Sequence, residues 1–376
     1  MKFNVPSKTL YNLTSAVSKV INAKNALTIL NSFLFQLEDN VLTITGSDVE
    51  NALTARIEVE QAEGEGKFCI DARRLVDLLK ELPEQGLEIT IDDETLEIII
   101  SYSSGRYTMV ATPGDQYPEY RREDDDTEPS TFTCPTSVVL KGIDKTIFAV
   151  GTDDFHPQMM GILLDIVPEQ ITFVATDTRK LVRYISREVQ PGVTAKCILP
   201  FKPATILKNV FAKDDTLTIT LTGKSATMQN GTFTFNCRFI KGNYPPYNRV
   251  IPENNPYVLR VDRMRFLNAV RRVGVFVDPG FGLEKFKITN DQIHLKSSDS
   301  SMLTSGNERL DCEYQGPEIV IGFNAPFLIE ICNTLATSDI IVSLSDPSRP
   351  GVFRPTEDEA NTELLMLLMP MNVTEF

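Results

Sequence analysis

The same succession of short motifs occurs three times along the 376 residues, at intervals of roughly one third of the chain. The clearest marker is a turn sequence that contains an aspartate and reads GSDVE, ATDTR and SSDSS, with the aspartates at Asp48, Asp177 and Asp299. A segment with helical apolar spacing follows each turn, as IDARRLVDLLKEL, LPFKPATILKNVF and FNAPFLIEICNTL. Another predicted helix precedes each turn. The repeated order predicts three copies of one domain, at residues 1–127, 128–254 and 255–376.

Each copy also contains strand patterns beside its two predicted helices. Apolar and polar residues alternate in TLTITLT and GTFTFNCRF, and the stretch between them ends in the turn signal QNG. Each copy is therefore predicted to consist of two βαβββ units. Antiparallel sheets that carry helices on one side belong to the α+β class. The acidic run at 120–130 and the two prolines within 250–257 are typical of linkers between such domains.

The charge of the chain is unevenly distributed. Its formal net charge is −14, which by itself argues against nucleic-acid binding. Residues 1–24 nevertheless contain four lysines and no acid, and residues 257–277 contain five arginines against one aspartate. If the first helices of the copies share one surface, that surface is basic and suited to phosphates. The alternative is that these side chains are ordinary solvated helix faces.

The repeat also limits the possible geometry of a ring. A domain of about 125 residues is roughly 35 Å across. Six such domains in a ring leave a hole of about 35 Å, wide enough for duplex DNA, whereas three leave almost none. Two chains, and not one, would therefore be needed to surround DNA.

Several enzyme and metal classes are disfavoured by the sequence. The six cysteines include no CxxC pair, so buried thiols are expected rather than disulfides or zinc ligands. The only histidines are His156 and His294, and neither has a second ligand at metal-binding spacing. TGKSA at 222–226 resembles a phosphate loop, but Thr218 stands where its first glycine belongs. We therefore expect no catalytic residue, no metal and no cofactor.

The repeated aspartates leave one enzymatic alternative open. A carboxylate that recurs in every copy is expected to cap a turn by accepting backbone N–H groups. An enzyme that uses Asp177 as an acid is the competing hypothesis. The N-terminus lacks the apolar core of a signal peptide, and the longest apolar run, Leu364–Met369, is too short for a membrane helix. A cytoplasmic protein without membrane contact is expected.

The motifs MKFNVPSKTL, GSDVE, VATDTRKL, YPPYNRVIP and MPM occur in this order across the whole chain. In this order the sequence resembles the bacterial DNA polymerase III beta subunit family, the sliding clamps. The resemblance implies a DNA-clamp fold in which two chains form a head-to-tail ring, with helices inside and sheets outside. Such a ring encloses double-stranded DNA without reading its sequence and confers processivity. The implied partners are the clamp loader, the DNA polymerase III alpha subunit and other proteins with a clamp-binding motif.

The resemblance also implies a pocket that receives short partner peptides. Proline fixes the backbone of such a groove before its ligand arrives, and methionine adapts to different apolar partners. Family members often have Gly-His where this chain has Thr178-Arg179, so the pocket floor and the preferred peptide are expected to differ. By position the pocket comprises Met159, Thr176, Thr178, Arg179, Lys180, Leu181, Pro245, Arg249, Val250, Leu367, Met369, Pro370 and Met371.

Two further sets of residues are expected, one at a joint that the resemblance implies and one that faces DNA, chosen by the charge of the predicted helices and, for Lys24, by the resemblance. The joint between the two chains would involve Tyr107 and Met109 on one side and Val275 and Phe276 on the other, although all four could also be ordinary core residues. The residues expected to face DNA are Lys19, Lys24, Lys141, Lys202, Lys208, Arg263, Arg271 and Arg272. The rival function is a homo-oligomeric peptide-binding scaffold that does not contact DNA.

Overall fold

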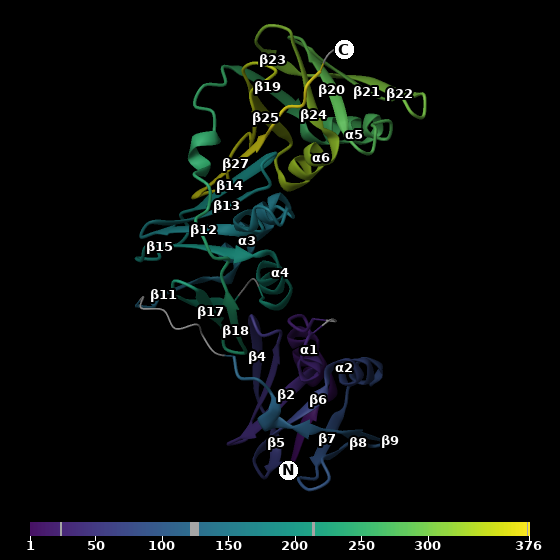
Figure 1. Ribbon diagram of the computed structural model, residues 1–376, viewed down its shortest axis with the longest axis vertical. Helices are drawn as coiled ribbons and strands as arrows, with labels where there is room; N and C mark the ends of the chain where they lie inside the picture. Colours follow the sequence, from purple (N-terminus) through teal and green to yellow (C-terminus); the bar gives the residue numbers. More distant parts are fainter. Residues whose placement is uncertain (23–24, 121–127, 213–214, 374) are drawn as a thin grey trace. The chain divides into compact units, whose positions relative to one another are not determined.

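The computed structural model describes residues 1–22, 25–120, 128–212, 215–373 and 375–376 (Figure 1). The chain forms two compact units. The first consists of Met1–Ser137 and Lys202–Phe239, and the second of Val138–Phe201 and Ile240–Phe376. This division cuts through the middle repeat, so the boundaries 1–127, 128–254 and 255–376 stay a prediction. Most of the acidic linker predicted at 120–130 lies outside the described residues.

The first unit contains the whole first repeat and half of the second. Its first repeat has the predicted order of two βαβββ units, with short β5 (Glu60–Glu63) and β10 (Thr112–Pro113) added at sheet edges. The principal elements are β1 (Lys2–Pro6), α1 (Ser7–Val17), β2 (Ser32–Glu38), β3 (Val41–Ser47), β4 (Asn51–Glu58), β6 (Gly66–Asp71), α2 (Ala72–Glu81), β7 (Gly86–Ile91), β8 (Glu97–Tyr102) and β9 (Gly105–Val110). The second repeat contributes β11 (Ser130–Pro135), most of α4 (Phe201–Val210), β16 (Thr216–Leu221), β17 (Ser225–Gln229) and β18 (Phe233–Arg238).

The second unit contains the other half of the second repeat and the whole third repeat. From the second repeat come most of α3 (Thr136–Thr146), β12 (Gly161–Val167), β13 (Gln170–Thr176), β14 (Lys180–Ser186) and β15 (Ala195–Pro200). The third repeat consists of β19 (Tyr257–Asp262), α5 (Arg263–Gly274), β20 (Leu283–Ile288), β21 (Gln292–Asp299), β22 (Thr304–Asp311), β23 (Glu313–Gln315), β24 (Ile319–Asn324), α6 (Ala325–Thr334), β25 (Asp339–Leu344), β26 (Gly351–Pro355) and β27 (Thr362–Leu368).

Each unit has one nine-stranded sheet that two repeats build together. In the first unit β4 pairs antiparallel with β18, and in the second β14 pairs antiparallel with β27. The orders are β10-β6-β2-β3-β4-β18-β17-β16-β11 and β15-β12-β13-β14-β27-β26-β25-β19-β23. The two smaller sheets, β5-β1-β7-β8-β9 and β22-β21-β20-β24, have β5 and β9, and β22 and β24, as their edge strands. Among the described residues, β9 and β22 thus keep one unpaired side.

The second helix of a repeat begins at a side-chain cap in the first and third repeats. The Asp71 carboxylate accepts a hydrogen bond from the Arg74 N–H at 2.8 Å, and the Asn324 side chain accepts one from the Phe327 N–H at 3.2 Å. Such caps satisfy N–H groups that have no partner inside the helix. The buried faces carry leucines at helical spacing, such as Leu75 and Leu79 on α2. The cap therefore sets where the helix starts, and the leucines set its rotation.

One buried carboxyl group in β20 lies within the apolar interior of the second unit. Glu284 is fully buried, and neither of its carboxyl oxygens has a hydrogen-bond partner among the described residues. Burial, aided by the charge of nearby Glu308, raises the pKa of Glu284 to about 9. The group is therefore protonated at neutral pH, because an isolated charge in such surroundings is strongly disfavoured.

Three features of the structure concern membrane helices, metal sites and the phosphate-loop-like segment TGKSA. Within the described ranges, no helix is long and apolar enough to cross a membrane. The same ranges contain no group of three His, Cys, Asp or Glu side chains placed to hold a metal ion. Residues 222–224 connect β16 to β17, so TGKSA lies between strands as predicted, and not at the start of a helix.

Candidate functional site

The three repeated aspartates are turn caps, as the sequence predicted. In each turn one carboxylate oxygen, Oδ1, accepts two backbone hydrogen bonds. Asp48 accepts from Glu50 and Asn51, at 3.2 and 2.7 Å. Asp177 accepts from Arg179 and Lys180 at 2.9 and 2.8 Å, and Asp299 accepts from Ser301 and Met302 at 2.8 and 3.1 Å. This bonding explains the recurrence of aspartate without any acid chemistry.

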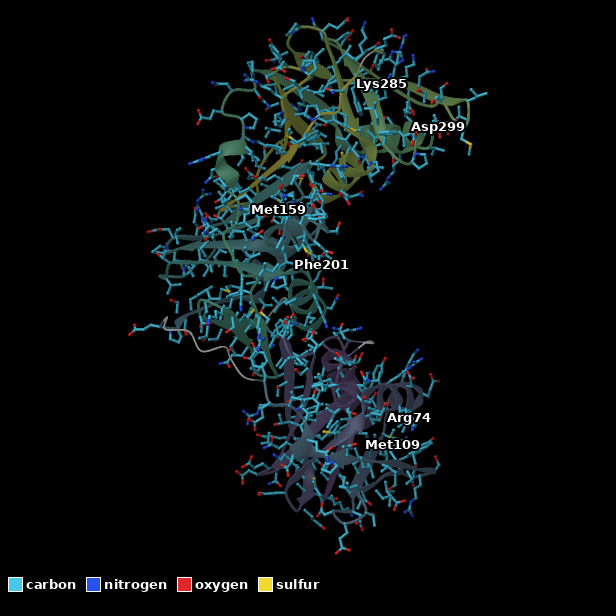
Figure 2. All side chains as sticks on the ribbon, in the orientation of Figure 1. Arg74, Met109, Met159, Phe201, Lys285 and Asp299 are labelled. Atoms are coloured by element: carbon cyan, nitrogen blue, oxygen red, sulfur yellow. The ribbon has the colours of Figure 1, made fainter. Side chains whose placement is uncertain are left out.

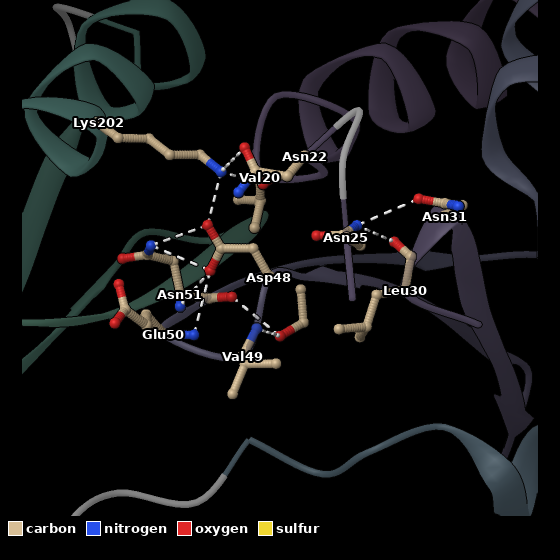
Figure 3. A network of polar contacts seen from close by, with 11 residues as sticks. Val20, Asn22, Asn25, Leu30, Asn31, Asp48, Val49, Glu50, Asn51 and Lys202 are labelled. Carbon is tan, nitrogen blue, oxygen red and sulfur yellow. Dashed lines mark hydrogen bonds and ion pairs between the residues drawn. The ribbon is translucent and has the colours of Figure 1, made fainter. Parts of the chain in front are cut away.

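The second oxygen of Asp48 binds a lysine from the following repeat (Figure 3). Lys202, at the start of α4, places its Nζ 2.6 Å from Asp48 Oδ2. The same ammonium donates to the backbone oxygen of Val20 at 2.6 Å and to Asn22 Oδ1 at 3.1 Å. Because its donors are used in this way, Lys202 ties the first aspartate turn and the end of the α1 segment to α4. Its expected contact with DNA stays a prediction.

The second aspartate turn contains a buried lysine. Lys180 is only 5 % exposed. Its Nζ lies 3.1 Å from Asp177 Oδ2, 3.0 Å from Glu330 Oε2 and 3.8 Å from the centre of the Phe327 ring. Two carboxylates and an aromatic face compensate for the water that the ammonium loses. Glu330 and Phe327 are both on α6, so this lysine joins the second turn to a helix of the third repeat.

A cavity of about 500 Å³ lies beside Lys180, within the second unit. Four of the residues predicted for the peptide pocket line it, namely Met159, Thr178, Arg179 and Lys180. The remaining lining residues are Phe148, Val150, Gly151, Thr152, Asp153, His156, Asp177, Phe327 and Glu330. None of these was predicted from the sequence to line a pocket. The segment 323–335, which supplies Phe327 and Glu330, was predicted only as a repeated helix. Its position after the third aspartate turn could have indicated that it forms a wall of the cavity.

Two other residues of the predicted pocket, Leu181 and Leu367, belong to a hydrophobic cluster. Tyr244 and Tyr247, from the Tyr-Pro-Pro-Tyr segment, pack with Leu181 of β14 and Leu367 of β27. The backbone also connects two of these segments, because the Met369 N–H donates to the Arg179 carbonyl at 2.8 Å. The tyrosines are thus anchors that hold the proline segment against the sheet.

The predicted pocket residues divide into buried and accessible groups. Four side chains are buried and contribute to the interior of the walls, namely Thr176, Lys180, Leu181 and Leu367. Another four are half-buried, namely Met159, Pro245, Pro370 and Met371. Exposed side chains that a ligand could contact are those of Thr178, Arg179, Arg249, Val250 and Met369. The structure therefore favours an apolar rim, with Arg179 and Arg249 as the accessible charges.

Thr178 adopts a backbone conformation that favours glycine. Its φ is +76°, and Val49 in the equivalent turn of the first repeat has φ +80°. A β-branched residue in this left-handed region is strained by about 1–2 kcal/mol. The structure thus gives a physical reason why family members often have glycine at this position. Threonine adds a side chain to the cavity wall and strain to the backbone.

We expect Thr178→Gly to raise the free energy of unfolding by about 0.5–1 kcal/mol, since the relief of strain exceeds the extra entropy of glycine in the unfolded chain. Urea denaturation of the two proteins measures this difference. Thr218→Gly is the control, because Thr218 lies in the regular strand β16 and its loss should lower stability. Equal destabilisation by both substitutions would contradict the strain at Thr178.

Most of the cations expected to face DNA have partners within the protein. Lys141 pairs with Glu188 and Glu359 at 3.5 and 3.3 Å. Arg263 donates to the backbone oxygens of Thr337 and Cys332, Arg271 donates to Asn333, and Arg272 pairs with Glu308. Lys208 also takes part in an interaction. Lys19 is exposed, and Lys24 lies outside the described residues. The basic helices are thus partly neutralised.

The four residues predicted for the joint belong to two separate surfaces. Tyr107 and Met109 are on the edge strand β9, where the Tyr107 ring stacks on Tyr102 with centroids 6.2 Å apart. Val275 follows α5 and is 76 % exposed. Phe276 packs directly on β22, because a Cβ atom at Gly306 would lie 2.6 Å from its ring. Exposed apolar side chains beside two unpaired strand edges are typical of an interface.

Comparison with known proteins gives the family. Three family models match almost the whole chain, described as the N-terminal domain of the DNA polymerase III beta subunit at residues 1–121, the central domain at 133–246 and the C-terminal domain at 248–371. The beta sliding clamp of Pseudomonas putida is 22 % identical, and that of Escherichia coli K12 is 25 % identical. In both comparisons the alignment covers 99 % of this chain and 100 % of the relative.

Solved structures give the same fold. The DNA polymerase sliding clamp of Pseudomonas aeruginosa superimposes with a TM-score of 0.92 at 23 % identity, and the beta subunit from Thermotoga maritima with 0.90 at 23 %. Each alignment covers 99 % of this chain and 100 % of the other. The predicted family and the predicted α+β clamp fold are therefore confirmed. This chain belongs to the DNA polymerase III beta subunit family and is a sliding clamp, a subunit without catalytic activity of its own.

Proposed function

We propose that two copies of this chain close head-to-tail into a ring that encircles double-stranded DNA and tethers replication proteins through the pocket beside Lys180. The observation that carries the proposal is that the edge strands β9 and β22 each have one side without a partner strand among the described residues. β4 and β14 follow the first two aspartate turns, and each pairs with the last strand of the next repeat. β22 follows the third turn, β9 is the last strand of the second βαβββ unit of the first repeat, and each has one free side. Pairing β22 with β9 of a second copy repeats the same junction.

The β4–β18 junction within the chain supports one register for this pairing. The residue before the turn aspartate pairs with Ala52 in the first repeat and with Ser305 in the third. On the other strand, Gly105 and Phe233 each follow a two-residue hairpin loop, so Thr108 corresponds to Asn236. Ala52 pairs with Asn236. Ser305 of one copy should therefore lie opposite Thr108 of the other.

A cysteine pair tests both the joint and the enclosure of DNA. Residues directly opposite each other in a sheet have Cα atoms about 4.5–5.5 Å apart, within the range that a disulfide bridges. We expect the variant with Ser305→Cys and Thr108→Cys to form covalent dimers on oxidation. The matched control, Thr304→Cys with Thr108→Cys, shifts the register by one residue and turns the thiols to opposite faces, so it should cross-link far less.

Oxidation in the presence of DNA then distinguishes a ring from a scaffold that does not contact DNA. A closed ring should stay on a nicked circular plasmid in 1 M salt, because the link is topological and salt screens only ionic contacts. The same ring should slide off linear DNA. A protein that stays monomeric at high concentration, or a dimer that circular DNA does not retain, would contradict the proposal.

The remaining assignments follow from the same proposal. Lys19, Lys24 and the partly neutralised cations would meet phosphates weakly, which permits sliding. The pocket beside Lys180 would bind the DNA polymerase III alpha subunit, the clamp loader and other proteins with a clamp-binding motif. Three domains at 1–127, 128–254 and 255–376 and a cytoplasmic location agree with this role.

A further inference from the structure

The first two aspartate turns each contact a helix that belongs to the following repeat. The first turn receives Lys202 from α4, through the second oxygen of Asp48. Beside the second turn, Lys180 bridges Asp177 to Glu330 of α6, and its ammonium covers the Phe327 ring. In both turns Oδ1 caps the backbone and Oδ2 lies within 3.1 Å of an ammonium. Both in-chain junctions share this division of the two oxygens, but the ammonium comes from the following helix in the first and from the turn itself in the second.

The third turn has only half of this arrangement. Asp299 Oδ1 accepts from two N–H groups and from the Ser301 hydroxyl at 2.6 Å. Its Oδ2 has no cation partner among the described residues. Hydrogen bonds, the largest from Ser301, hold the pKa of Asp299 below its usual range, so the carboxylate is charged at neutral pH. Next to it Met302 and Leu303 are 72 % and 92 % exposed (Figure 2, where Asp299 is labelled).

The start of α2 has no aspartate turn of another repeat to contact within the described residues. The repeated segments 70–82, 199–211 and 323–335 align α2 with α4 and α6, and they place Arg73 at the position of Lys202. The Arg73 side chain is 92 % exposed, and its nearest carboxylate is Asp77 on the same helix, at 3.8 Å. The neighbouring Arg74 is also exposed (Figure 2). The start of α2 therefore presents two accessible guanidinium groups.

We propose that Arg73 of one copy pairs with Oδ2 of Asp299 in a second copy, beside the exposed Met302–Leu303 tip, and so completes a third turn–helix contact. The inference rests on the proposed ring, because only a head-to-tail joint brings these two surfaces together. The charges are complementary, and the contact would lie alongside the β9–β22 pairing, as Lys202 and Asp48 lie alongside β4–β18. Arginine suits this position because its fork of donors can reach a carboxylate oxygen that is already partly used.

A double-mutant cycle on the dimer dissociation constant tests the contact. Asp299→Asn removes the charge and keeps an oxygen that can cap the turn, and Arg73→Gln removes the cation. We expect each single substitution to weaken the dimer about fivefold to fiftyfold, and the double variant to be scarcely weaker than either. Lys80→Gln is the control, since it removes the same charge from an exposed position two turns further along α2 and should change the constant little.

The outcomes separate the contact from the ring itself. Effects of Arg73→Gln and Asp299→Asn that simply multiply, or a loss with Lys80→Gln as large as with Arg73→Gln, would overturn the proposed pair while leaving a dimer in place. A wild-type protein that does not dimerise would instead overturn the proposed ring. Thermal melting of Asp299→Asn shows whether the variant stays folded. A folded variant whose dimer is weakened, and whose effect is not additive with that of Arg73→Gln, supports the contact.

Discussion

Val275→Asp is expected to convert the dimer into monomers, with a dissociation constant raised about a hundredfold or more. Val275 is 76 % exposed in the single chain, so the substitution should leave the fold intact. In the proposed joint the same position becomes buried against β9 of the second copy. A carboxylate there would lose its water without gaining a cation, and an unpaired buried charge is strongly unfavourable. Sedimentation velocity over a range of concentrations measures the shift.

Val250→Asp provides the matched control for this prediction. Val250 is also an exposed valine, at 54 %, but it lies in η5 (Tyr247–Val250) at the predicted peptide pocket. The same chemical change at this position should leave dimerisation unaltered. If both variants stay dimeric, the surface that contains Val275 is not the joint.

Glu284→Gln is expected to remove a large pH-dependent loss of stability. The folded-state pKa of Glu284 is about 9, well above its ordinary value of 4.5. A group whose pKa is raised on folding contributes its full stability below the unfolded pKa, and this is lost as the pH rises toward the folded value. Between pH 5 and 8 the wild-type free energy of unfolding should therefore fall by about 1.4 kcal/mol per pH unit because of this one group.

Urea denaturation at several pH values tests the prediction, through the difference in the free energy of unfolding between Glu284→Gln and wild type. The stability of Glu284→Gln relative to wild type should grow steadily with pH and reach the order of 4 kcal/mol near pH 8. Glu318→Gln is the control, because Glu318 is exposed and its pair with Lys287 lies at the surface. Parallel pH curves for Glu284→Gln and wild type would show that the buried carboxyl group does not titrate as described.

The repeat in the sequence predicted the elements and the turns well, for a local physical reason. Asp48, Asp177 and Asp299 bond to backbone groups within three residues, so the turn motif contains its own explanation. Helix caps such as Asp71 and alternating strands are equally local signals. The order of the βαβββ units and the family followed from these signals together.

The contacts that shape the site are not local, and the sequence did not reveal them. Lys202 and Asp48 are 154 residues apart in the chain, and Lys180 meets Glu330 across 150 residues. Nothing in KLVRYIS indicates that its lysine is buried, because a surface lysine and one that two carboxylates neutralise look identical in sequence. The burial of Glu284 was hidden in the same way. These side chains are placed by contacts between segments that lie far apart in the chain, which only the structure specifies.

Pairing between strands of one chain has a consequence for how the assembly responds to dilution. β4 with β18 and β14 with β27 belong to one chain, so their pairing does not depend on the protein concentration. A seam between β9 and β22 of separate chains lacks this covalent connection, and its lifetime depends on strand pairing and side-chain contacts alone. Diluted protein should therefore separate at this seam while both nine-stranded sheets stay intact. The proposed ring could therefore be opened at such a seam without unfolding either chain.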